Sequence, residues 1–504
     1  MVKTKKKFYI TTSIAYTNAP PHCGFALEII QADVIARYHR LMGEEVFFLT
    51  GTDEHGAKVV KAAQEVKKNP REFVEEISGR FKNLKKLLNL SNDDFIRTSD
   101  RERHWPTVKK VWLKLKENDD IYKKKYRGLY CPGCEAFITK KDLKNGECVV
   151  HKIKPEVIDE ENYFFRLSRY SKEIERIIEK NQIKIIPKTR RNEMLSFIKQ
   201  GLEDISFSRP RKNLKWGIPV PVDESQIIYV WGDALVNYIS AIGYFKETKT
   251  FKKYWPADIH CIGKDIQKFH CAIWPGMLLS LKLPLPKTIF VHGFITVSGQ
   301  KMSKSLGNIV DPFELVKKYG TDPVRYFLLR EIPPTEDGDF TYEKFEQRYN
   351  SDLASGLGNL TARVITMANG LKIKDLRFKI KDLRLRKEID NTRLEHRKLL
   401  DEFKFNEALM AIWKLISFCD RYIEKERPWE ENKKQKETIY NLLFALANIA
   451  SLLQPFLPET SKEIFNQLGI KSVDEKRGFK LYSSKFYEIK FKQVKKGKSL
   501  FPRI

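Results

Sequence analysis

The segment FYITTSIAYTNAPPHCGFALEII, residues 8–30, decides the fold class. Its first five residues, Phe8–Thr12, are predicted to form a short buried strand, and the prolines that follow indicate a loop. Apolar side chains then recur at helical spacing as far as Ile35, and a second apolar run, Val46–Leu49, predicts another buried strand. This order is typical of a doubly wound α/β domain, whose ligand lies at the carboxyl edge of a parallel sheet.

The same rhythm returns later, after an interruption. Residues Ile121–Tyr163 combine a dense cluster of Cys, His, Gly and Pro with short strand-like pieces, which indicates a small inserted module. Strand-like runs resume at Ile227–Val230, Ile259–Ile262 and Thr288–Val291, and from about Tyr342 the periodicity is almost purely helical. We therefore expect an α/β protein: a split, Rossmann-like parallel-sheet domain with a connective insert, followed by an α-helical bundle.

These transitions predict six consecutive parts. They are the first half of the sheet domain (1–118), the connective insert (119–222), the second half of the sheet domain (223–295), a KMSKS-containing loop with a linking region (296–340), the helical domain (341–470) and a basic C-terminal tail (471–504). Because the tail leaves no room for a further module of about 100 residues, we expect a monomer.

Composition narrows the classes of protein further. The 504 residues include 93 Lys and Arg against 65 Asp and Glu, a formal net charge of +28, and 42% of residues are hydrophobic. Such apolar content argues against a wholly disordered chain. The sequence contains no run of about 18 uncharged apolar residues, so it predicts no membrane-spanning helix. The basic start Met1–Lys7 leads into no cleavable apolar region, so we expect a soluble, cytoplasmic protein. The charge favours a polyanionic partner such as nucleic acid, although a general abundance of lysine explains it equally well.

A metal site is predicted from spacing alone. Cys131-x2-Cys134 and Cys148-x2-His151 supply four sulfur and nitrogen ligands in two close pairs. Tetrahedral Zn²⁺ takes such a set, and a closed four-ligand site is structural. We therefore expect one structural zinc per chain in a knuckle at residues 131–151; cysteines that merely pack are the alternative.

Two turns carry groups suited to phosphate. His22–Gly24 precedes the first helix, whose N-terminal N–H groups and dipole attract phosphate, and the histidine can donate a hydrogen bond there. Later in the chain, Lys301 and Lys304 lie three residues apart in a segment of glycines and serines, where they could fold over a triphosphate and neutralise departing pyrophosphate. Taken alone, the first turn is more typical of a purely structural turn, and two lysines three residues apart are typical of a charged surface loop.

Taken together, the motifs resemble those of class I aminoacyl-tRNA synthetases. His22-Cys23-Gly24-Phe25 and Lys301-Met302-Ser303-Lys304-Ser305 are similar to the two signature motifs of that class. Further blocks narrow the resemblance to methionyl-tRNA synthetases from Phe8 to about Leu468: Gly51–Gly56 (GTDEHG), Tyr229–Ala234 (YVWGDA), His260–Asp265 (HCIGKD) and Phe269-His270. The resemblance implies activation of L-methionine with ATP and Mg²⁺ to methionyl-adenylate, then transfer to tRNA-Met, as translation initiation and elongation require.

The resemblance also implies roles for individual residues. Asp53 would pair with the α-ammonium group of methionine, and Arg209 corresponds to an arginine linked to activation. ATP would be bound by His22, Gly24, Lys301, Ser303 and Lys304. The methionine pocket would comprise Ile14, Tyr16, Asp53, Trp231, Ala234, Leu235, Tyr238, Phe269, His270 and Trp274. On the helical domain, the CAU anticodon would be recognised by Asn359, Arg363 and Trp429.

One position departs from the family pattern. The first motif ordinarily ends in a second histidine, where this chain has Phe25. A phenylalanine cannot donate a hydrogen bond to the α-phosphate, and loss of one such donor can cost a factor of about 10²–10³ in rate. This departure leaves open a catalytically impaired tRNA-binding paralogue, and a class I synthetase for another apolar amino acid is a separate alternative. The second usually needs a large editing insertion, because an apolar pocket discriminates one methylene by only about 1–3 kcal/mol.

Overall fold

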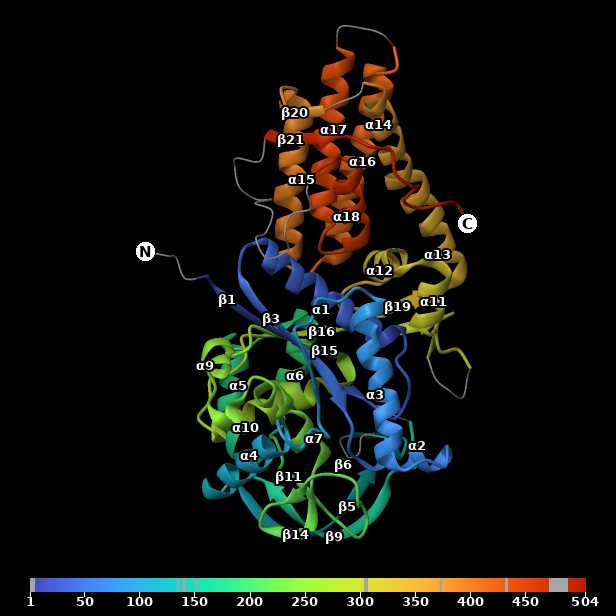
Figure 1. Ribbon diagram of the computed structural model, residues 1–504. Coiled ribbons are helices and arrows are strands. Elements are labelled where there is room, and N and C mark those ends of the chain that lie inside the picture. Colours follow the sequence, from blue (N-terminus) through green and yellow to red (C-terminus); the bar gives the residue numbers. More distant parts are fainter. Residues whose placement is uncertain are drawn as a thin grey trace.

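The computed structural model describes residues 5–133, 136–138, 142–149, 152–302, 307–371, 374–430, 434–470 and 488–504. A seven-stranded parallel sheet forms its centre, with the helical bundle at one end and the insert at the other (Figure 1). The strand order is β10 (Lys184–Ile186), β16 (Thr288–His292), β15 (Ile259–Gly263), β1 (Lys7–Thr12), β3 (Glu45–Asp53) and β2 (Ala15–Tyr16), and β4 (Asp94–Arg97) also pairs with β3.

Alternating side chains of β1 point to two separate hydrophobic cores. Phe8 and Ile10 join the larger core, which continues into the helical bundle, whereas Tyr9 joins the core on the opposite face of the sheet. This alternation follows from the two-residue period of a strand. Helices of the first half are α1 (Cys23–Leu41), α2 (Ala57–Glu65), α3 (Pro70–Leu87) and α4 (Trp105–Glu117).

The insert is antiparallel. Its main sheet has the order β11-β9-β5-β6, formed by β5 (Ile121–Cys131), β6 (Ala136–Ile138), β9 (Glu156–Phe165) and β11 (Ile205–Ser206). A two-stranded ribbon consists of β7 (Leu143–Lys144) and β8 (Glu147–Cys148). The helices that follow are η2 (Leu167–Tyr170), α5 (Ser171–Glu179) and α6 (Lys188–Lys199); between α5 and α6 the chain forms β10, which pairs with β16 in the central parallel sheet.

One expected strand of the parallel sheet belongs elsewhere. The run predicted at Ile227–Val230 is β14 (Asp223–Ile228), which pairs antiparallel with β12 (Ser208–Pro210) and β13 (Pro219–Val220). The prediction was therefore wrong for this strand. The short connections between these strands permit an antiparallel ribbon, whereas a parallel neighbour needs a crossover of a dozen or more residues.

The second half of the sheet domain returns to short helices. These are α7 (Val230–Ala234), α8 (Asn237–Ser240), η3 (Tyr244–Lys246), α9 (Lys249–Tyr254), η4 (Lys264–Ile266), the π-helical turn η5 (Phe269–Ile273) and α10 (Trp274–Ser280). A linking region follows, with β17 (Ile295–Val297), β18 (Gln300–Lys301), β19 (Gly338–Phe340), α11 (Pro312–Tyr319), α12 (Thr321–Arg330) and α13 (Tyr342–Arg348).

The C-terminal part is a helical bundle, as its periodicity predicted, with one exception. Its helices are η6 (Tyr349–Gly358), α14 (Asn359–Gly370), α15 (Leu383–Asp401), α16 (Phe405–Glu426), α17 (Gln435–Leu453) and α18 (Pro458–Gln467). The exception is an antiparallel pair, β20 (Lys374–Lys379) with β21 (Glu488–Gln493), which returns the end of the chain to the bundle. Within the described residues, no helix combines the length and apolar character that crossing a membrane requires.

Candidate functional site

A cavity of about 560 Å³ lies at the carboxyl ends of the central strands. This is where a doubly wound sheet binds its ligand. The sequence-predicted residues that line it are Ile14, Tyr16, His22, Gly24, Asp53, Arg209, Trp231, Ala234, Leu235, Tyr238, Phe269 and His270. Trp274 is not among the lining residues; it is completely buried and its indole ring lies 5.9 Å from that of Tyr238.

His22 caps the first helix with its own side chain. Its Nδ1 accepts a hydrogen bond from the backbone N–H of Gly24 at 3.0 Å. A side chain at Gly24 would collide with the imidazole of His22, since an added Cβ would lie 2.7 Å from its Cε1. Burial lowers the pKa of His22, which favours the neutral ring. In the neutral ring with Nδ1 as acceptor, Nε2 carries the proton and is the donor.

Phe25, the departure from the family pattern, is part of an aromatic pair. Its ring meets that of Phe81 on α3 edge to face, with centroids 5.2 Å apart and planes at 85°. Such pairs contribute about 0.5–1.5 kcal/mol beyond their burial. Phe25 also lines the cavity, so the residue that departs from the family pattern both packs on α3 and borders the cavity.

The second signature motif meets the first in space. A Cβ added at Gly24 would lie 3.6 Å from Cε of Met302, and Cys23 donates its N–H to the carbonyl of Val310 at 3.0 Å. Met302, within the motif, and Val310, beyond its end, therefore both lie against the start of α1. Lys301 ends β18, while Ser303 and Lys304 lie outside the described residues, as does the side chain of Lys301.

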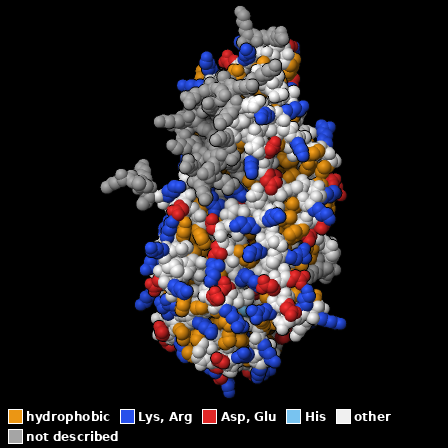
Figure 2. All heavy atoms as spheres, in the orientation of Figure 1, with side chains coloured by type: hydrophobic (Ala, Val, Ile, Leu, Met, Phe, Trp, Pro, Cys, Tyr) orange, Lys and Arg blue, Asp and Glu red, His pale blue; other side chains and the backbone are white. Residues whose placement is uncertain are grey.

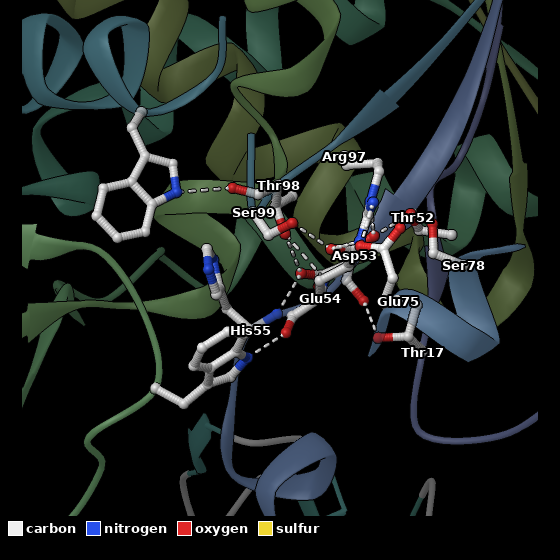
Figure 3. A network of polar contacts seen from close by, with 12 residues as sticks. Thr17, Thr52, Asp53, Glu54, His55, Glu75, Ser78, Arg97, Thr98 and Ser99 are labelled. Carbon is white, nitrogen blue, oxygen red and sulfur yellow. Dashed lines mark hydrogen bonds and ion pairs between the residues drawn. The ribbon is translucent and has the colours of Figure 1, made fainter. Parts of the chain in front are cut away.

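Asp53 stands at the end of β3 in a dense polar network (Figure 3). Its backbone carbonyl accepts hydrogen bonds from Thr17 N–H at 2.9 Å and Thr17 Oγ1 at 3.0 Å. Thr98 Oγ1 approaches its carboxylate at 3.4 Å. The next residue, Glu54, is completely buried and forms two hydrogen bonds with Arg97, at 2.7 and 3.0 Å. This network holds the end of β3 in place while the Asp53 carboxylate lines the cavity.

The opposite part of the cavity is aromatic. Trp231 and Phe269 stack with centroids 3.7 Å apart and planes at 6°. Tyr238 donates its hydroxyl hydrogen to His270 Nε2 at 2.7 Å, and Nδ1 of the same ring donates to the carbonyl of Ile266 at 3.0 Å. Burial lowers the pKa of His270 to about 4, so the ring is neutral near pH 7. Rigid apolar walls of this kind suit a polarizable thioether.

Arg209 and a second polar pair complete the lining. Arg209 Nε lies 3.5 Å from Glu160 Oε2, and its guanidinium lies 4.1 Å from the centroid of Tyr130. The pair that sequence reasoning missed is Glu28 and His292, both buried, with Oε2 and Nε2 2.8 Å apart. Burial opposes the charged imidazole, but the hydrogen bond to Glu28 raises the pKa of His292 above its usual value. The available signal was an acidic residue between two apolar positions of α1.

The predicted metal site is only half described. Cys131 and Cys148 are both buried in one small hydrophobic cluster with Ile138. Cys134 and His151 lie outside the described residues. Among the residues that are described, no three His, Cys, Asp or Glu side chains are grouped to hold a metal ion. The two described thiols fit half of a tetrahedral sulfur and nitrogen set.

The three residues predicted to contact the anticodon lie on the helical bundle. Asn359 is exposed in the first turn of α14, and Trp429 is 51% exposed in the turn after α16. Arg363 on α14 reaches α16, where Nη2 lies 2.6 Å from Glu424 Oε1. The C-terminal end of α16 lies at the end of the bundle farthest from the central sheet (Figure 1). Figure 2 shows Lys and Arg spread over the visible face among Asp and Glu.

Two family profiles match the chain. The profile described as "tRNA synthetases class I (M)" matches residues 8–142 and 137–365, and the "Anticodon-binding domain of tRNA ligase" matches residues 382–496. Together they extend over both the sheet domain and the helical bundle.

Named relatives agree with these profiles. The methionine–tRNA ligase of Thermotoga maritima is 46% identical over 93% of this chain and 76% of its own length. That of Brucella suis is 41% identical over 94% of both chains. The Mycobacterium tuberculosis methionyl-tRNA synthetase in complex with methionyl-adenylate superposes with a TM-score of 0.92 and 37% identity, covering 99% of this chain and 100% of its own. Neither a silent paralogue nor a ligase for another apolar amino acid gains support from these relatives.

Proposed function

Because the chain belongs to the class I methionyl-tRNA synthetase family, we propose how its own side chains divide the work of a methionine–tRNA ligase. The ligase activity itself follows from the family: L-methionine and ATP give methionyl-adenylate, and the methionyl group then passes to tRNA. The observation that carries the assignment of roles is the meeting of the His22–Gly24 turn, Asp53 and the aromatic walls in one cavity.

Activation begins with attack of the methionine carboxylate on the α-phosphorus of ATP, and pyrophosphate leaves as the new P–O bond forms. Nε2–H of His22 and the N-terminus of α1 stabilise charge on the α-phosphate. Lys301 and Lys304 neutralise the β- and γ-phosphates, and Ser303 and Gly24 let the two signature motifs close on them. The family uses ATP with Mg²⁺, which supplies further neutralisation of the phosphates.

Methionine is held at both ends. Asp53 pairs with its α-ammonium group, because a charge removed from water needs an opposite partner. The stacked Trp231 and Phe269 hold the thioether, with Ile14, Tyr16, Ala234, Leu235, Tyr238 and His270 as the remaining walls and Trp274 as a support behind Tyr238. Arg209 completes the polar side of the cavity and clamps a carboxylate or phosphate.

The helical bundle binds tRNA-Met. Asn359 and Arg363, one turn apart on α14, hydrogen-bond the edges of unpaired anticodon bases, and the exposed indole of Trp429 stacks on one of them. A structural Zn²⁺ bound by Cys131, Cys134, Cys148 and His151 stabilises the insert. A cytoplasmic location and a monomeric state remain predictions.

The first experiment is amino-acid-dependent ATP–pyrophosphate exchange. Exchange stimulated by methionine, and not by leucine, isoleucine or valine, is the expected result. His22→Ala and Asp53→Asn should lower it, the first through its rate constant and the second through the KM for methionine. Exchange with none of the amino acids, in protein that still binds tRNA-Met, would leave only a tRNA-binding protein.

A further inference from the structure

A second cleft, of about 630 Å³, is lined in part by His55, two residues after Asp53. Three aromatic side chains belong to its lining, His55, Trp105 and Trp216, and we call them its aromatic floor. We call it the tryptophan cleft. Its volume lies within the range of ordinary small-molecule sites, about 300–1,000 Å³. No role proposed above involves any of these three residues.

The aromatic floor is fixed in place. The imidazole of His55 lies edge-on between the two indoles, 5.9 Å from Trp105 and 5.7 Å from Trp216 by ring centroid. Trp105 donates its Nε1–H to the carbonyl of Thr98 at 3.0 Å, and Trp216 donates to that of Glu54 at 2.5 Å. Because both indole N–H groups are used by the protein, only the ring surfaces remain for a ligand, and flat rings bind bases by stacking.

His55 presents one ring nitrogen to the tryptophan cleft. Its Nδ1 donates to Asp233 Oδ2 at 2.6 Å, and His104 Nε2 donates to the other oxygen at 2.7 Å. Burial opposes the charged carboxylate, yet the two imidazoles hold the pKa of Asp233 below its usual value. No hydrogen bond of the described residues uses Nε2 of His55, and this atom is not among the buried unpartnered ones. It is therefore available to a hydroxyl group of a ligand.

The rim supplies cations that the protein does not neutralise. Arg71, Arg101 and Lys215 are exposed, and within the described residues none of them forms an ion pair. Arg101 lies 4.9 Å above the ring of Trp105. The rim acids are mostly used elsewhere: Glu75 pairs with Arg97 at 2.7 Å, and Asp100 accepts two backbone N–H groups at 2.9 Å. Only Glu102 among the rim acids has no such partner in the described part of the chain.

We propose that the tryptophan cleft binds a nucleotide unit, with its base on Trp105 or Trp216, a sugar hydroxyl on His55 Nε2 and its phosphate on Arg101 and Lys215. Flat rings, one open nitrogen and unpaired cations match the base, sugar and phosphate of a single nucleotide. That unit could come from a free nucleotide or from the unpaired 3′ end of an RNA, and the two sources share this chemistry.

The test measures binding to the full-length protein with the catalytic cavity filled by a non-hydrolysable methionyl-adenylate analogue. The probes are 5′-AMP, by equilibrium dialysis, and a 5′-fluorescein-labelled RNA tetranucleotide ACCA, by fluorescence anisotropy. Arg101→Gln and Lys215→Gln should each weaken binding and lower the salt dependence of the tetranucleotide by about 0.7 in log–log slope. Trp216→Leu and Trp105→Leu identify the stacking ring, and the substitution that removes it should weaken binding at least fivefold.

Lys212→Gln is the matched control, since Lys212 is exposed nearby but does not line the tryptophan cleft. Methionine-dependent ATP–pyrophosphate exchange should be unchanged in Arg101→Gln and Lys215→Gln, which shows that these variants fold. The exchange assay also keeps this inference separate from the catalytic roles proposed above. Binding of AMP alone identifies a free-nucleotide site, and binding of the tetranucleotide identifies an RNA-end site. No binding of either probe, or equal effects of Lys212→Gln and Lys215→Gln, overturns the proposal.

Discussion

Arg325 and Asp33 form an ion pair of 2.8 Å in which both side chains are completely buried. The same guanidinium donates to the carbonyls of Leu88, Pro455 and Phe456 at 2.7–3.0 Å. Asp33 belongs to α1, whose first turn lines the cavity, whereas Pro455 and Phe456 connect α17 to α18 in the bundle. One side chain therefore joins the helix that bears His22 to the helical domain.

Replacing Arg325 should destabilise the whole chain. Arg325→Met removes one of the cations that neutralise the buried carboxylate of Asp33, and it removes the hydrogen-bond donors of three backbone carbonyls. We therefore expect the free energy of unfolding to decrease by about 3–5 kcal/mol. Urea unfolding followed by circular dichroism measures it. Arg176→Met, which removes an exposed pair with Glu173, should have a much smaller effect on the free energy of unfolding, because solvent screens that pair. Equal midpoints for the two variants would show that the buried pair contributes little.

The role of Phe25 can be separated from its packing. Phe25→His supplies a second donor to the α-phosphate and should increase the rate of ATP–pyrophosphate exchange. Phe25→Leu removes the edge-to-face contact with Phe81 without adding a donor. The leucine variant should lose about 0.5–1.5 kcal/mol of stability with that contact, and only the histidine variant should react faster. If both variants react at the wild-type rate, another group already serves the α-phosphate.

Anticodon recognition should be separable from activation. Arg363→Gln and Trp429→Ala should each raise the KM for tRNA-Met at least tenfold, because edge recognition and base stacking are lost. Their methionine-dependent exchange rates should match the wild type, since both residues lie on the bundle. Lys425→Gln, a neighbouring exposed position on α16, serves as the control. An unchanged KM in Arg363→Gln and Trp429→Ala would contradict the proposed contacts.

Acid should destabilise the bundle through His396. Burial lowers the pKa of this histidine from 6.5 to about 3, so below pH 6.5 the unfolded chain binds a proton that the folded chain does not. The free energy of unfolding is therefore highest with respect to this group above pH 6.5. Below pH 6.5 it decreases by about 1.4 kcal/mol for each pH unit, because only the unfolded chain takes up the proton. His396→Asn should remove that slope between pH 6 and 4.5 in urea titrations. Parallel slopes for the two proteins would show that His396 does not titrate as described.

The zinc proposal predicts a metal content of one per chain. Cys148→Ser should abolish zinc in the purified protein and lower the thermal midpoint, since a structural site contributes directly to folding. Cys419 is another buried cysteine, but it lies in the bundle, so the Cys419→Ala protein should contain as much zinc as the wild type. Elemental analysis by mass spectrometry measures both. Equal zinc in the two variants would exclude Cys148 as a ligand.

The sequence alone was sufficient for the fold class and for most of the cavity. Phe8–Thr12 and Val46–Leu49 are strands because an apolar run with turn signals at both ends has few other solutions. The sequence predicted that His22, Asp53 and Trp231 line the cavity, because the family resemblance rests on residue types and on the order of motifs, and both can be read from the sequence. The helical bundle followed from its 3.6-residue period in the same way.

Tertiary structure alone decided which groups face each other. In the structure, β14 belongs to an antiparallel ribbon, and Trp274 packs against Tyr238 instead of lining the cavity. Phe25 contacts Phe81, and Arg325 forms an ion pair with Asp33. Tertiary structure also set the ring of His22 with Nδ1 toward Gly24, which decides the nitrogen that donates. Periodicity says that a side chain is buried, but not against what, because partners far apart in the chain are chosen only when the whole core packs.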